Sequence, residues 1–83
     1  MNPRIRLVEP LDGYKLRLEF TNGELGLFDC SNLLELGVFQ ELKDREYFKQ
    51  ARVFQGTVVW PHEQDICPDT LYLDSEKISE HVA

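Results

Sequence analysis

Alternating apolar residues ahead of an Asn-Gly pair constrain the fold of this chain more than any other feature. In "YKLRLEF", residues 14–20, an apolar side chain falls at every second position, as in a strand with one buried face. Asn22 and Gly23 follow directly, and this dipeptide favours a two-residue hairpin turn because both central residues must adopt a positive φ. The sequence therefore predicts an antiparallel hairpin.

The same turn predicts the register of the second strand, which lies in "ELGLFD". Counting outward from the turn, Phe20 should oppose Leu25, and Leu18 should oppose Leu27. The two leucines of the second strand would then lie on the buried face, together with the apolar residues of the first strand.

A second hairpin is predicted in "RVFQGTVVW". Gln55 and Gly56 provide the turn, and the β-branched residues around them are typical of strands. This turn places Val53 opposite Val58. The strand should end at Trp60, because Pro61 has no N–H to donate to a neighbouring strand.

The other segments carry weaker patterns. In "RIRLVE", Ile5 and Leu7 alternate with arginines, which predicts a short first strand with both apolar side chains on one face. "CSNLLELG" has capping residues and a glycine stop, which predicts a helix of about two turns. "VFQELKDREYFKQA" has helical spacing, and Asp44 can cap a second short helix within it.

These elements predict one α+β domain over residues 1–83. The predicted order is βββααββ, with an antiparallel sheet built from hairpins and short helices on one side of it. Pro68 suits the first position of a further helical turn, and residues 74–83 are expected to form a short helical tail.

Charge and cysteine content limit the compartment and the partners. The net charge is −6. An acidic chain is a poor isolated binder of nucleic acid, because such binding draws most of its affinity from basic side chains on the phosphates. Two cysteines are too few for a disulfide scaffold. Residues 1–10 lack the apolar centre of a signal peptide, and no apolar run approaches the roughly 20 residues of a membrane helix. We expect a reduced, cytoplasmic protein that neither enters a membrane nor binds nucleic acid.

The stretch "VVWPHEQDICPDTLYLDS" concentrates residue types that bind metals or move protons, among them His62, Asp65, Cys67 and Asp69. The two cysteines and two histidines of the chain do not form ligand pairs at a zinc-binding spacing, and we expect no metal or other cofactor. No glycine-rich phosphate loop or nucleophile elbow is present. Cys30 begins a predicted helix, whose dipole could lower its pKa, but we favour a small buried hydrophobe.

Several motifs together resemble a known family. They are "FTNGE", "FQELKDREYF", and a Trp-Pro pair followed by Asp65 and by "PDTLY". In this order and spacing, over residues 5–73, they resemble the bacterial domain of unknown function 2442. The family usually has an Asn-Gly-like turn after its Trp-Pro pair, where this chain has His62 and Glu63.

The resemblance implies a compact α+β domain of bacteria without an established enzymatic activity. Some members of the family carry an additional helix-turn-helix region that binds DNA, and some are encoded beside another small protein in toxin-antitoxin-like pairs. The 83 residues contain no such additional region, so we do not expect the DNA-binding role to transfer.

Two hypotheses about function follow. We prefer a non-catalytic module that binds a protein partner or itself, because aromatic anchors dominate interfaces. Its interaction or loop-organising residues would be Trp60, Pro61, Asp65, Pro68 and Tyr72. The alternative is a small enzyme or ligand-binding domain that uses the loop of residues 62–69. Its site residues would be His62, Asp65, Cys67 and Asp69.

Overall fold

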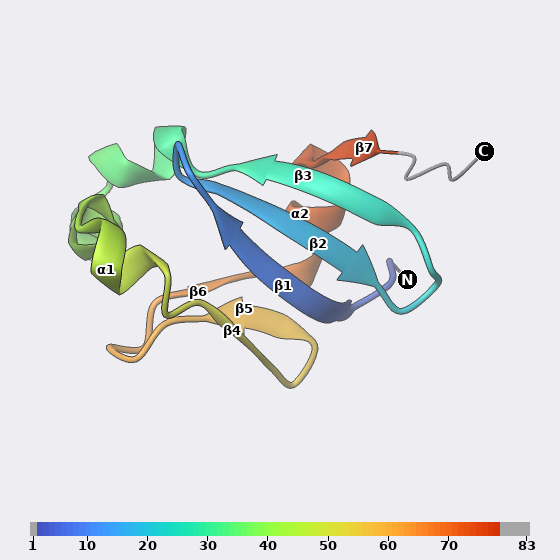
Figure 1. Cartoon of the computed structure of the whole chain (residues 1–83). Coiled ribbons are helices and arrows are strands. Elements are labelled where there is room, and N and C mark those ends of the chain that lie inside the picture. The colour runs from blue at the N-terminus through green and yellow to red at the C-terminus, as the bar shows by residue number, and fades with distance from the viewer. Residues whose placement is uncertain (1, 79–83) are drawn as a thin grey trace.

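A computed structural model describes residues 2–78 as two antiparallel sheets with short helices (Figure 1). The elements are β1 (Ile5–Leu11), β2 (Lys15–Phe20), β3 (Leu25–Asp29), the 3-10 helices η1 (Ser31–Glu35) and η2 (Gly37–Lys43), α1 (Arg45–Phe48), β4 (Arg52–Phe54), β5 (Thr57–Val59), β6 (Asp65–Ile66), α2 (Pro68–Asp74) and β7 (Glu76–Ile78). The predicted α+β class is confirmed. Two short strands that the sequence did not predict, β6 and β7, are added to it.

The larger sheet has the strand order β1-β2-β3-β7, and the smaller sheet has the order β4-β5-β6. Figure 1 shows β1, β2 and β3 side by side, with the smaller sheet below β1 and α2 behind the larger sheet. The helical segments between β3 and β4 lie together at the left end of that view. The Ile5 N–H donates to the Gly56 carbonyl (2.9 Å), which ties β1 to the second hairpin.

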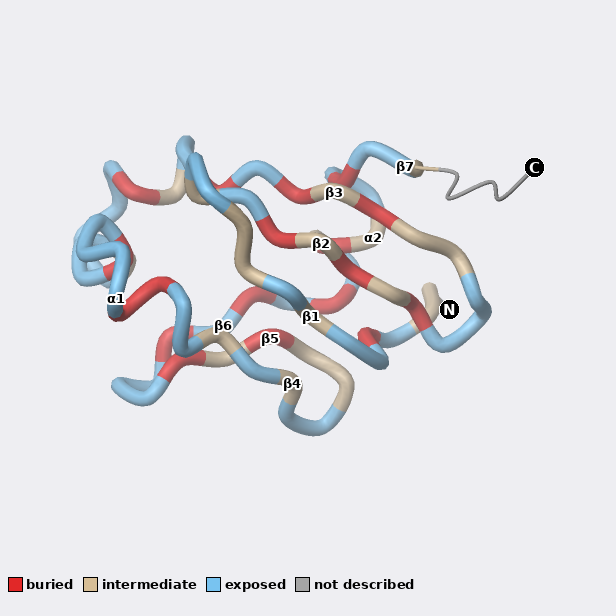
Figure 2. Tube along the Cα trace, in the orientation of Figure 1, coloured by how far each residue is buried: buried red, intermediate tan, exposed pale blue. Residues whose placement is uncertain are grey.

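The core follows the alternation that the sequence shows in β2. Leu16, Leu18 and Phe20 are fully buried. The residues that alternate with them are more accessible, since Lys15 is exposed and Arg17 and Glu19 are half-buried (Figure 2). Trp60, which directly follows β5 of the smaller sheet, joins the same cluster. One core therefore serves both sheets.

The predicted register of the first hairpin is wrong by one residue. Leu18 opposes Gly26 rather than Leu27, and Glu19 rather than Phe20 opposes Leu25. As a result Gly26 is buried on the core side of β3, while the leucines of this strand are only half-buried.

The shifted register goes with a turn that is one residue longer than predicted. The Gly23 N–H donates to the Phe20 carbonyl (2.9 Å), and the Phe20 N–H donates to the Glu24 carbonyl (2.8 Å). Only Gly23 has a positive φ (89°), so the loop has three residues, a type I turn followed by a left-handed glycine. Asn22 instead accepts a hydrogen bond from the Glu24 N–H through its side chain (3.0 Å).

The second hairpin forms as predicted. Val53 opposes Val58 across the turn of Gln55 and Gly56. These two turn residues have φ values of 51° and 79°, as a two-residue turn of type I′ requires.

Two further expectations about local structure have mixed outcomes. Asp44 caps α1 as predicted, since its carboxylate accepts a hydrogen bond from the Glu46 N–H (3.0 Å). The prediction that Ile5 and Leu7 share a face is wrong, because the pairing of β1 with β2 shifts between them. Ile5 is buried and Leu7 is 55% exposed.

The predicted helical tail over residues 74–83 is wrong for residues 76–78, which form β7, and residues 79–83 lie outside the described residues. The strand forms because β3 offers it an open edge, where Leu25 pairs with Ile78. A segment this short and polar has little helical preference to compete with that pairing.

Candidate functional site

The stretch that the sequence singled out includes a tight hairpin loop between β5 and β6. The Trp60 N–H donates to the Gln64 carbonyl (2.9 Å), and the Glu63 N–H donates to the Trp60 carbonyl (3.0 Å). These are the bonds that Phe20, Gly23 and Glu24 make in the first hairpin. Here the left-handed position, at a φ of 74°, belongs to Glu63 and not to a glycine.

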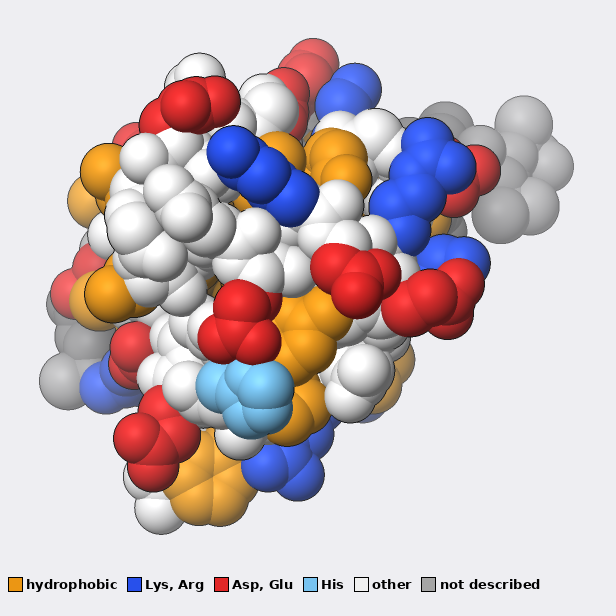
Figure 3. All heavy atoms as spheres, turned by 90° about the vertical axis from the view of Figure 1, so that its left-hand side faces the viewer, with side chains coloured by type: hydrophobic (Ala, Val, Ile, Leu, Met, Phe, Trp, Pro, Cys, Tyr) orange, Lys and Arg blue, Asp and Glu red, His pale blue; other side chains and the backbone are white. Residues whose placement is uncertain are grey.

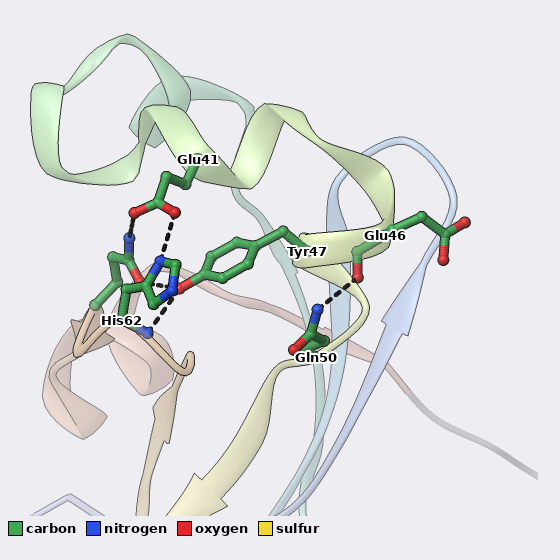
Figure 4. Close-up of polar contacts among 6 residues, drawn as sticks. Glu41, Glu46, Tyr47, Gln50 and His62 are labelled. Atoms are coloured by element: carbon green, nitrogen blue, oxygen red, sulfur yellow. Dashed lines mark hydrogen bonds and ion pairs between the residues drawn. The ribbon is translucent and has the colours of Figure 1, made fainter.

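A hydrogen-bond network fixes this loop against the helical end of the fold (Figure 4). The hydroxyl of Tyr47 donates to Oε1 of Gln64 (2.5 Å) and accepts from the N–H of His62 (2.8 Å). Nε2 of Gln64 donates to one carboxylate oxygen of Glu41 (3.0 Å), and Nδ1 of His62 lies 2.5 Å from the other. Because the backbone N–H of His62 provides one of these contacts, the four residues close a ring of hydrogen bonds.

Sequence reasoning identified only His62 among these four residues. Tyr47 stands in the segment with helical spacing, and the sequence singles out neither it nor Glu41 or Gln64. Glu41 lies 21 positions from His62 and 23 from Gln64, so no local pattern connects them.

Trp60 and Pro61 lie next to one another at the start of the loop but differ in burial. Trp60 is 1% exposed, and its indole N–H donates to the Phe48 carbonyl (3.0 Å). Its ring also packs against Phe48, with centroids 6.0 Å apart. The indole is therefore part of the core, whereas Pro61 is exposed on the loop.

Pro68 and Tyr72 connect α2 to the larger sheet. Pro68 stands at the start of α2, as predicted, and is buried. The Tyr72 hydroxyl donates to the Glu24 carboxylate (2.7 Å), and its ring packs edge-on against Phe20. The ammonium of Lys77 lies 4.0 Å from the centre of the Tyr72 ring.

Electrostatics around Tyr72 and Glu24 agree with this contact. The hydrogen bond from Tyr72 lowers the pKa of Glu24, with further lowering from Asn22 and Lys77. The same bond to Glu24 raises the pKa of the Tyr72 hydroxyl. The proton is therefore held on Tyr72 and the charge on Glu24.

The four residues of the alternative site do not converge. His62 lines an open hollow that includes Asp65 but neither Cys67 nor Asp69. Asp69 instead accepts a hydrogen bond from the side chain of Asn2 (3.3 Å). Cys67 is an exposed free thiol.

The other cysteine is a buried hydrophobe, as we favoured. Cys30 is fully buried, and this burial, with a smaller effect of Asp29, raises the pKa of its thiol to about 12. A thiol with such a pKa carries almost no thiolate at neutral pH and is inert as a nucleophile.

Two open hollows of similar size, about 420 and 430 Å³, flank the loop. The first is lined by Gly37, Val38, Phe39, Glu41, His62, Glu63, Gln64 and Asp65. Figure 3 shows the histidine side chain among acidic side chains, with hydrophobic side chains beside it. The lining of the first hollow contains the contact between Glu41 and His62, and its residues include no hydroxyl, thiol or amine side chain.

The second hollow lies over the outer face of the smaller sheet. Its lining consists of Arg52, Phe54, Val59, Trp60, Pro61, Glu63 and Asp65. Trp60 is buried, and the other six residues lie at the surface. We call these six residues the outer face; they are Arg52, Phe54, Val59, Pro61, Glu63 and Asp65.

Two further properties concern metals and membranes. Within residues 2–78, no three His, Cys, Asp or Glu side chains gather closely enough to hold a metal ion. None of the helices in this part of the chain has the length and apolar character needed to cross a membrane.

The fold defines a small α+β domain of two antiparallel sheets that share one core. The chain matches the family described as "Protein of unknown function (DUF2442)" over residues 5–76, and it belongs to this family. The family membership that the sequence motifs implied is confirmed. No curated protein and no solved structure matches the chain.

Proposed function

We propose that this chain is a non-catalytic protein-interaction domain and that the outer face is its contact surface. The observation that carries this proposal is the position of Phe54. Its side chain is 53% exposed on a sheet face, beside the half-buried Val59 and the exposed Pro61. Aromatic side chains, phenylalanine among them, are enriched in protein interfaces relative to the rest of the surface.

The strand geometry explains why these side chains point outward. Val53 and Val58 oppose one another, and Val58 is fully buried, so the neighbouring positions on β4 and β5 face away from the core. Phe54 and Val59 are therefore held on the surface by the same register that builds the core. The adjacent Arg52 adds a residue type that is enriched in interface hot spots.

The kind of partner follows from what is known of the family. Some members are encoded beside a second small protein in toxin-antitoxin-like pairs, and such a neighbour is the first partner to test. A cytoplasmic location, as expected from the sequence, fits this role.

The proposal is tested by retention of partners from a lysate of the native host. We would immobilise the native chain, the Phe54→Ser variant and the Leu7→Ser variant, and identify retained proteins by mass spectrometry. Leu7 is a matched control, because it is 55% exposed but lies on β1, outside the outer face. We expect the same defined protein with the native chain and Leu7→Ser, and its loss with Phe54→Ser.

If no protein, including this chain itself, is retained in a Phe54-dependent manner, the proposal is wrong. The folded state of each variant is checked beforehand by its 1H–15N NMR spectrum. Phe54 and Leu7 are both more than half exposed, so neither substitution removes a core contact.

A second candidate is a small-ligand site at the first hollow. The observation that favours it is the contact of 2.5 Å between Nδ1 of His62 and the Glu41 carboxylate, at the wall of that hollow. Titration of the labelled chain with small polar metabolites should then shift the His62 ring signals. Unchanged signals throughout such a panel would remove this candidate.

A further inference from the structure

We infer that the outer face binds a second copy of the same chain through a twofold axis that runs along β5. This inference rests on the proposed function, because it names the partner of the proposed contact surface. The register of the smaller sheet places opposite charges on the outer face, and these charges support a second copy as the partner.

Three residues form a row across the outer face. Arg52 opposes Val59, and Val59 opposes Asp65, so one residue of each strand lies on the same line and the same side. Arg52 and Asp65 are exposed and Val59 is half-buried. The row carries a positive end on β4, an apolar centre on β5 and a negative end on β6.

The two charged ends of the row do not pair within one chain. Neighbouring strands lie about 4.8 Å apart, so Arg52 and Asp65, two strands apart, are separated by roughly 10 Å. No ion pair of either residue is formed within residues 2–78, where the acidic and basic side chains of other elements do pair, as Glu46 does with Lys49. The outer face thus presents opposite charges with no partner on their own sheet.

A twofold axis between two copies can pair these charges. When two identical faces meet, the axis lies in the plane between them, and an axis along β5 exchanges the two flanking strands. Arg52 of each copy then faces Asp65 of the other copy, and this contact occurs twice. Val59 meets its own equivalent at the axis, where the interface is dry and apolar.

Phe54 completes the surface at one end of the row. It stands two residues from Arg52 on β4, opposite Thr57, and therefore on the same side of the sheet. The same rotation brings it over the β6 side of the second copy. Its exposed ring would be covered in the dimer.

The expected association is weak. The outer face offers six residues, far fewer than the roughly 20–30 residues a side of a standard interface. The acidic net charge of −6 on each copy also opposes association. We therefore expect a dissociation constant of roughly 10 µM to 1 mM, and the concentrations of the test must reach this range.

The test is sedimentation velocity of the native full-length chain from about 10 µM to 1 mM. The expected result is a mass that rises with concentration from 9.7 kDa toward twice that value. The Arg52→Asp variant places two acidic side chains opposite one another at each contact, and the Asp65→Arg variant places two basic ones there. Each variant alone should remain monomeric.

An equimolar mixture of Arg52→Asp and Asp65→Arg should associate again, because every contact in the mixed dimer joins opposite charges. The double variant should also recover self-association. Lys43→Asp and Glu35→Arg are matched controls, since these exposed residues lie on the helical segments away from the outer face. They should associate as the native chain does.

A native chain that stays monomeric up to 1 mM would overturn the inference, and so would single variants that associate as well as the native chain. A failed mixture of correctly folded variants would overturn the twofold arrangement. If the native chain is monomeric but retains another protein through Phe54, the proposed function stands and only the second copy is wrong as partner. If neither occurs, both proposals fall.

Discussion

The hydroxyl of Tyr47 donates a hydrogen bond to Oε1 of Gln64 at 2.5 Å, and the hydroxyl oxygen of Tyr47 accepts one from the backbone N–H of His62. Gln64 is only 8% exposed, so its amide depends on partners within the protein. One hydroxyl thus joins α1 to the loop between β5 and β6, 17 residues further along the chain.

Removal of this hydroxyl should destabilise the fold. Tyr47→Phe leaves the Gln64 oxygen and the His62 N–H without their partner, and a buried polar group without a partner costs about 1–3 kcal/mol. Urea unfolding of the variant should show this loss. A change smaller than about 0.5 kcal/mol would mean that water replaces the hydroxyl at little cost.

Glu63→Gly should stabilise the protein by about 0.5–1 kcal/mol. Glu63 has a φ of 74°, where a side chain is strained and glycine is not, and the equivalent position in the first hairpin is already Gly23. Glu46→Gly is the control, because Glu46 lies in α1, where glycine should destabilise by about 0.5–1 kcal/mol. Equal effects of the two substitutions in thermal unfolding would contradict the strain argument.

Gly26→Ala should destabilise the protein by about 1–3 kcal/mol. An added Cβ at Gly26 would lie 2.8 Å from Oγ of Ser75 and 2.9 Å from the Phe20 ring, so the start of β7 or the core must shift. Gly37→Ala is the matched control, since nothing lies within 4 Å of its Cβ position and its φ is ordinary. Denaturant unfolding of both variants should separate them clearly, and similar midpoints would show that the Ser75 contact is soft.

The carboxylate of Glu24 should titrate below its ordinary pKa of 4.5, mainly because of the hydrogen bond from Tyr72. Since the pKa is lowered in the folded state, the stabilisation is present above about pH 4.5 and is lost as the pH falls through the folded-state value. In Tyr72→Phe, NMR titration should show the pKa of Glu24 moving up toward 4.5. Tyr14→Phe, whose hydroxyl bonds to the Lys43 carbonyl, should leave it unchanged.

The two hairpins show how far turn chemistry alone can be trusted. Both turns contain a glycine after a polar residue, yet Gln55 and Gly56 form a two-residue turn while Asn22 lies in a three-residue loop. The second register was predicted correctly, and the first was displaced by one residue. Either loop satisfies the local preference of glycine for positive φ, so the packing of Gly26 and Phe28 against the core had to decide.

The candidate site was predicted less well than the fold. The sequence pointed to the loop after Trp60, and Pro68 begins a helix as predicted. It did not reveal the ring of Glu41, Tyr47, His62 and Gln64, because its members come from elements that are brought together only by packing of the helical end on the smaller sheet.

The sequence by itself determined the alternation that builds β2, the positions of the hairpins and the family, because periodicity and turn chemistry act between near neighbours in the chain. The tertiary structure alone decided that residues 76–78 form a strand, that Trp60 is buried, and that Arg52, Val59 and Asp65 form one row. Each of these outcomes depends on which strand edge or core position is free when the distant segments meet, and no local preference contains that information.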